Sequence, residues 1–167
     1  VTLRFDLTTL LKKKPDSPPI DGEIVFHFNE NDSLTRKVTV RPRGYFRLQT
    51  CSFPPIMVNF KKSVVVGPDS IKFKKVKLVT HCNAGKYADD YVAREYLTYK
   101  LYNVLTDSSI RVRLLRINYV DTENKRKPST QFGFFIEPVE MVAKRSNSVE
   151  VAANNLNQTH IIPKVMD

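Results

Sequence analysis

The chain has 167 residues, which is long enough for one domain with a hydrophobic core. Of these residues 41% are hydrophobic and 26% are charged, a composition typical of neither a disordered nor a membrane protein. Lysine and arginine outnumber aspartate and glutamate by 27 to 17, and the net charge of +10 predicts a surface that attracts phosphates, acidic polymers or acidic proteins. No apolar stretch approaches the length of about 20 residues that a membrane-spanning helix needs, so we expect no membrane span.

The first half of the chain predicts β-strands. Several segments alternate apolar and polar residues or are rich in β-branched and aromatic residues, as strands are. These segments are 1–7, 23–28, 34–40, 56–60 and 76–79. The polar residues between 28 and 34 have strong turn chemistry and predict a hairpin, and Gly67-Pro68 interrupts the connection between the last two strands.

Residues 86–105 change to a helical period, contain no glycine or proline, and carry acidic residues near their start. The apolar arc that we expect to pack on the sheet consists of Tyr87, Tyr91, Leu97, Leu101, Val104 and Leu105. Residues 111–120 and 132–136 predict two more strands. The expected fold class is therefore α+β, a mostly antiparallel sheet with one long packed helix.

Cys51 and Cys82 are the only cysteines in the sequence. If strands 56–60 and 76–79 pair as a hairpin about Gly67-Pro68, the two cysteines lie at nearly equal distances from that turn and hence near each other. Two interpretations stay open. The cysteines form a disulfide worth roughly 3 to 4 kcal/mol in the chain-entropy model, or they are reduced thiols that pack as small apolar groups.

Motifs of common enzymes are absent from the sequence. It contains no G-x-S-x-G, H-E-x-x-H or G-K-[ST] motif, and its five glycines include no G-x-G-x-x-G, so hydrolase, P-loop and Rossmann sites are not predicted. The segment 41–47, RPRGYFR, places three arginines around Gly44 and is a candidate anion-binding turn, with a solvated turn as the alternative. No nucleic-acid-binding signature accompanies it, so nucleic acid is not an expected partner.

Two charged residues fall on the predicted helix where it faces the sheet. Arg94 lies within the expected apolar arc and Glu95 lies at its edge, and a charge in that position needs a partner. Lys77, on the strand before the helix, is the partner that we expect for Glu95. A structural ion pair and a pair that positions a phosphate are equally compatible with the sequence.

The order of these motifs resembles the N-terminal half of the CotH family of atypical protein kinases, and is most similar to exported relatives in Bacteroidetes. The matching segments in chain order are 41–47 (RPRGYFR), 53–62 (FPPIMVNFKK), 75–82 (KVKLVTHC), 91–101 (YVAREYLTYKL), 111–121 and 133–137 (GFFIE). The resemblance covers roughly residues 35–145. It implies a kinase-like N-lobe, with residues 1–145 as a single domain and 146–167 as a linker or the start of a C-terminal lobe.

The resemblance also implies which residues face a nucleotide. They are Arg43, Gly44, Lys77, Arg94, Glu95 and Glu137. Lys77 matches only by its place on the strand before the helix, and Tyr45 stands where CotH proteins have asparagine. No catalytic or metal-binding residue of the family falls within this chain.

The function that the resemblance implies is ATP-dependent phosphorylation of Ser or Thr on an exported or surface protein. The full-length protein would bind ATP with Mg²⁺ or Mn²⁺, and its C-terminal lobe would supply the catalytic acids, so this chain would be inactive alone. We expect an exported protein that is periplasmic, surface-bound or secreted. The alternative is a non-catalytic exported module that binds an anionic polymer or an acidic protein through its basic face.

Overall fold

A computed structural model of the protein describes residues 1–14, 16–66 and 71–151. Its strands are β1 (Thr2–Phe5), β2 (Ile20–His27), β3 (Ser33–Pro42), β4 (Ile56–Val66), β5 (Ile71–Val79), β6 (Val112–Asp121) and β7 (Ser129–Ile136). Its helices are α1 (Leu7–Lys13), α2 (Tyr45–Thr50), α3 (Ala88–Leu105) and α4 (Val139–Arg145). Most of the expected linker, residues 152–167, lies outside the described residues.

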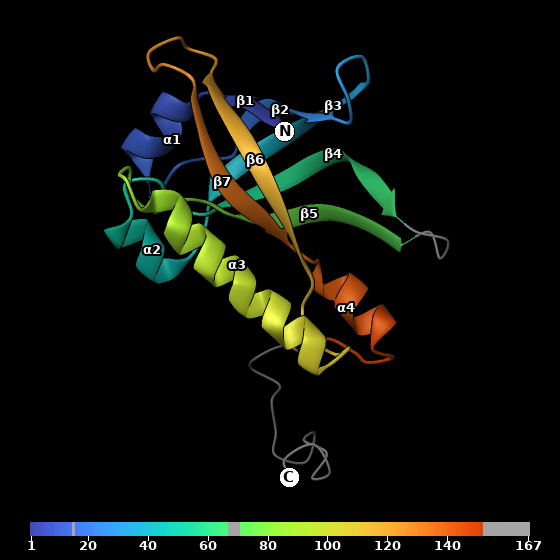
Figure 1. Cartoon of the computed structure of the whole chain (residues 1–167). Coiled ribbons are helices and arrows are strands. Elements are labelled where there is room, and N and C mark those ends of the chain that lie inside the picture. The colour runs from blue at the N-terminus through green and yellow to red at the C-terminus, as the bar shows by residue number, and fades with distance from the viewer. Residues whose placement is uncertain (15, 67–70, 152–167) are drawn as a thin grey trace.

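The strands form a closed barrel in the order β1-β2-β3-β4-β5-β7-β6. Neighbouring strands are antiparallel except β1 and β6, which run parallel with Leu3 opposite Tyr119. The predicted fold class is therefore wrong, because the protein is not a kinase-like N-lobe built from a sheet and one long packed helix. The sequence pattern identified most strands and the β2–β3 hairpin, but β1 was not expected to bridge β2 and β6, and this double pairing closes the barrel (Figure 1).

The main hydrophobic core fills the barrel, since alternate residues of each strand point to its interior. Among the fully buried side chains are Leu3, Phe5, Val38, Val58 and Tyr119. Gly22 on β2 allows β1 to approach closely, because a Cβ atom at this position would lie 2.3 Å from the carbonyl oxygen of Arg4. Leu7 and Leu10 extend the core into α1, which packs at one end of the barrel.

The helix predicted at 86–105 is confirmed as α3, and it crosses the outside of the barrel over β6 and β7 (Figure 1). A second small core lies beneath it, in which Val92, Tyr96 and Tyr99 pack against strand residues that include Phe134 and Ile136. The helix covers the barrel from outside, so only one side of it is buried.

The apolar arc expected to pack on the sheet is instead exposed. Leu97 is 57% exposed, Leu101 67% and Val104 85%. The prediction was wrong because apolar residues occur on nearly every side of this helix, so its sequence offered two candidate faces. In the described part of the chain, no helix has both the length and the apolar character needed to cross a membrane.

Candidate functional site

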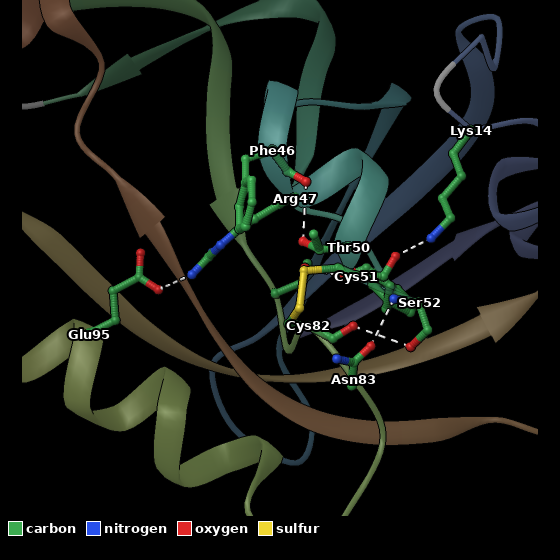
Figure 2. The surroundings of a disulfide bond; sticks show 11 residues. Lys14, Phe46, Arg47, Thr50, Cys51, Ser52, Cys82, Asn83 and Glu95 are labelled. Atoms are coloured by element: carbon green, nitrogen blue, oxygen red, sulfur yellow. Dashed lines mark hydrogen bonds and ion pairs between the residues drawn. A yellow bond between two sulfur atoms is a disulfide. The ribbon is translucent and has the colours of Figure 1, made fainter.

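Cys51 and Cys82 are joined by a disulfide, so the bridge rather than the pair of thiols is present in the structure (Figure 2). The β4–β5 register, with Ile56 opposite Leu78, carries the two cysteines to the same end of the hairpin as the sequence predicted. The bridge connects the end of α2 to the loop before α3. Next to it, the amide of Ser52 donates to the side chain of Asn83 at 2.9 Å, which further fixes this junction.

The arginine-rich turn predicted to bind an anion joins β3 to α2. The amide of Arg43 donates to the carbonyl of Pro55 at 2.8 Å, which holds the turn against the start of β4. Gly44 follows with a φ of 87°, a left-handed conformation that residues with a Cβ rarely adopt. The turn thus places Arg43 and Arg47 near Glu95 of α3.

Glu95 on α3 pairs with Arg47 on α2 at 2.6 Å, and both side chains are about one-third exposed (Figure 2). Arg43 lies close enough to Arg47 and Glu95 for their charges to shift its pKa. Burial lowers the pKa of Arg43, and the like charge of Arg47 lowers it further, while Tyr99 and Glu95 oppose the shift. Arg47 alone pairs with Glu95, and the additional charge of Arg43 nearby leaves an excess positive charge at this point of the surface.

A groove of about 490 Å³ lies between α2 and the start of α3, and Arg47 lines it. Aromatic side chains form much of its wall, since Phe46, Tyr87 and Tyr91 line it and are 71%, 58% and 68% exposed. The ammonium group of Lys86 lies 5.7 Å from the centre of the Tyr87 ring. Arginine binds phosphate oxygens well and aromatic rings stack on nucleobases, so the groove has the chemistry that a nucleotide needs.

Lys77 is not the partner of Glu95, because Arg47 occupies that role. Lys77 lies on β5, where it lines a separate cavity of about 200 Å³ together with Glu137 and Glu140. The predicted pair of Lys77 and Glu95 is wrong because it was inferred only from the order of the elements in the chain. In the structure, α2 packs beside α3 and brings a different cation to the glutamate.

Two further residues implied by the resemblance lie apart from the ion pair that joins α2 and α3. Arg94 is exposed on the outer side of α3 and makes no ion pair with a described residue. Glu137 accepts hydrogen bonds from the guanidinium group of Arg145 and from the amide of Arg111, both at 2.9 Å. Its carboxylate therefore connects α4 to the segment before β6, and Glu137 lines the smaller cavity of Lys77 rather than the groove.

The structure thus brings together Arg43, Gly44 and Glu95 of the predicted site, and it adds Arg47 and Tyr99. Arg47 belonged to the recognised basic segment, but its partner depends on the tertiary contact between α2 and α3. Tyr99 follows Glu95 by one helical turn, a spacing that could have indicated a shared face. Within the described ranges, no group of three or more His, Cys, Asp or Glu residues could hold a metal ion.

No family model, curated protein or solved structure matches this chain. The relation to the CotH family therefore stays a prediction from the sequence motifs.

Proposed function

We propose that the groove between α2 and α3 binds a nucleotide, and that the chain is the nucleotide-facing region of a CotH-like, ATP-dependent protein kinase. The observation that carries this proposal is the Arg47–Glu95 ion pair, with Arg43 nearby, beside a groove lined by aromatic side chains. The closed barrel replaces the lobe that the resemblance implied. The proposal therefore depends on the side chains of the groove and not on the overall fold.

Arg43 and Arg47 have different roles in this proposal. Glu95 holds the Arg47 guanidinium at 2.6 Å and so fixes its position at the groove. Arg43 does not line the groove itself, but it lies near the Arg47–Glu95 pair and forms no ion pair with a described residue. In this proposal it binds the phosphate oxygens that extend beyond Arg47. An arginine keeps its charge at any physiological pH, which makes the site's affinity for phosphate insensitive to pH in that range.

The aromatic wall of the groove would hold the base. A purine stacked on Tyr87 or Tyr91 gains on the order of 1 to 3 kcal/mol, which is typical of base–aromatic stacking. Glu95 is not assigned to the divalent cation of ATP in this proposal, since its charge is neutralised by Arg47. Catalytic and metal-binding acids would come from outside this sequence, and this chain alone would transfer no phosphoryl group to its exported protein substrate.

Thermal unfolding with and without ATP tests the proposal. At about 100 times its dissociation constant, a bound ligand adds about 2.7 kcal/mol, and a domain of this size should gain roughly 5 to 10 °C in melting temperature. The Arg43→Gln variant should lose most of this gain. Arg36→Gln is the matched control, because Arg36 is an exposed arginine nearer the start of β3. Equal gains for both variants, or no gain for the wild type, would contradict nucleotide binding.

A second candidate function, the binding of an acidic protein, is favoured by the outer face of α3. Leu97 and Leu101 are more than half exposed there, and the exposed cations Arg94 and Lys100 lie on the same helix. Exposed apolar side chains next to cations suit a protein partner better than a sugar polymer. If this candidate is right, Leu101→Gln and Arg94→Gln weaken the binding of an acidic amphipathic peptide. Both variants should keep the rise in melting temperature that ATP causes in the wild type.

A further inference from the structure

A larger cavity of about 660 Å³ lies at the end of the barrel near α1. Residues of α1, of the segment that follows the disulfide and of the β6–β7 loop line it. Three of the lining residues are cations, namely Lys14, Arg126 and Lys127, and none is acidic. A concave surface with one sign of charge concentrates ions of the opposite sign, so the cavity favours an anion.

The three cations differ in how they are held. The ammonium group of Lys14 donates to the carbonyl of Cys51 (Figure 2). This hydrogen bond holds in place one of the cations that line the cavity. Arg126 and Lys127 are exposed on the β6–β7 loop and form no ion pair with any described residue. Their neighbour Lys125, by contrast, pairs with Glu123 at 3.3 Å. Two of the cations are thus available to a ligand, and the third has a defined place.

His81 provides an independent sign of a ligand at this cavity. It lines the cavity, is only 6% exposed, and its Nδ1 atom has no hydrogen-bond partner within the described structure. A buried polar atom without a partner is rare in proteins and costs roughly 1 to 3 kcal/mol. Burial also lowers the pKa of His81, although Asp89 opposes this, so the ring is neutral at neutral pH.

The rest of the cavity is apolar. Leu7 and Leu11 line it from α1, and Phe53 lines it from the segment after the disulfide. The Phe53 ring packs against the His81 ring, with 4.5 Å between the centroids. A ligand that reached past the cations would therefore meet aliphatic and aromatic surface next to a neutral imidazole.

We propose that this cavity binds an amphiphilic organic anion, with its charged headgroup among Lys14, Arg126 and Lys127 and its apolar body against Leu7, Leu11 and Phe53. The volume is typical of cavities that take small organic molecules. The site is separate from the nucleotide groove, since Ala84 is the one residue that lines both among those described. The proposal therefore does not depend on nucleotide binding.

The test is an NMR titration of the isotope-labelled protein with three probes: octanoate, inorganic phosphate and hexanol. Octanoate should shift the amide signals of Ser129 and Gln131 and the ring signals of His81 in a saturable way. Phosphate lacks the apolar body and hexanol lacks the charge, so each should bind at least about tenfold more weakly, which corresponds to about 1.4 kcal/mol.

Charge reversal identifies the cations that are responsible. The double variant Arg126→Glu/Lys127→Glu should weaken octanoate binding at least about tenfold, and added salt should weaken it in the wild type. The matched control Lys72→Glu/Lys74→Glu reverses two exposed lysines on β5 and should leave the affinity unchanged. Equal loss in both variants, or tight binding of phosphate or hexanol alone, would overturn the proposal. Retention of ATP binding by the Arg126→Glu/Lys127→Glu variant would separate this site from the groove.

Discussion

The carboxylate of Asp121 connects the start of α1 to the β6–β7 loop. It is 2% exposed and accepts hydrogen bonds from the amide of Leu7 at 3.0 Å, the hydroxyl of Thr8 at 2.9 Å and the amide of Lys125 at 3.1 Å. Burial raises the pKa of Asp121, but the hydrogen bonds from Thr8, Lys125 and Glu123 lower it by more. The charged form is therefore the one that the folded protein stabilises.

We expect Asp121→Asn to lower the free energy of unfolding by about 2 to 3 kcal/mol at pH 7, because buried donors lose a charged acceptor. A folded-state pKa below the ordinary value means that this contribution is complete above about pH 4 and disappears as the pH falls through the folded-state pKa. Urea unfolding at pH 7 and at lower pH measures both effects, with the exposed Asp16→Asn as control. A variant as stable as the wild type at pH 7 would contradict this role.

The ion pair between Arg47 and Glu95 should contribute more to binding than to folding. Each side chain is about one-third exposed, and pairs of this kind typically add less than about 1 kcal/mol to stability. We expect a double-mutant cycle with Arg47→Gln and Glu95→Gln to give a coupling energy below about 1 kcal/mol for unfolding. Arg47→Gln should nevertheless weaken ATP binding about tenfold. A larger loss of stability than of affinity would make the pair purely structural.

The sequence predicted the basic turn at 41–47 but not all of its contacts. Three arginines around Gly44 indicated an anion-binding turn, which stays a prediction, and the structure adds that Gly44 has a positive φ. Lys77 was chosen as the partner of Glu95 because its strand precedes the helix. The actual partner, Arg47, lies on a six-residue helix that the sequence analysis did not predict, and so this contact could not be foreseen.

The two faces of α3 provide a direct test at the scale of a single element. Val92 is 3% exposed and packs on the barrel, whereas Leu101 is 67% exposed. We expect Val92→Ala to lower the free energy of unfolding by about 1 to 2 kcal/mol and Leu101→Ala to change it by less than about 0.5 kcal/mol. Urea denaturation of both variants measures the difference. A larger cost for Leu101→Ala would mean that the opposite face of the helix is buried.

The disulfide stabilises the junction of α2 with the loop before α3. It joins residues 31 positions apart, and the chain-entropy model gives a stabilisation of roughly 3 to 4 kcal/mol for such a loop. The Cys51→Ser/Cys82→Ser variant should lose about this amount in urea unfolding. Protein that is denatured without reductant should contain no titratable thiol. Two titratable thiols in protein from an oxidising compartment would contradict the bridge.

Considered as a whole, the molecule differs most from its predicted form in the closure of the barrel. Local alternation indicated most strands, and turn chemistry indicated the β2–β3 hairpin, which the structure confirms. Closure depends on the parallel contact of β1 with β6, whose residues lie far apart in the chain, as Leu3 and Tyr119 do. A non-local pairing of this kind leaves no local pattern, although the small residue Gly22 on β2 permits the close approach of β1.

We infer that a nucleotide binds between α2 and α3, and an NMR titration of the 167-residue chain with Mg-ATP tests this claim. We predict saturable shifts of the amide signals of Gly44, Arg47 and Tyr87, which line or adjoin the groove. The same titration of Arg43→Gln should give much weaker shifts, and the signals of Ser129 should stay unchanged in both. An absence of saturable shifts in the wild type, or shifts confined to residues away from α2 and α3, would contradict the claim.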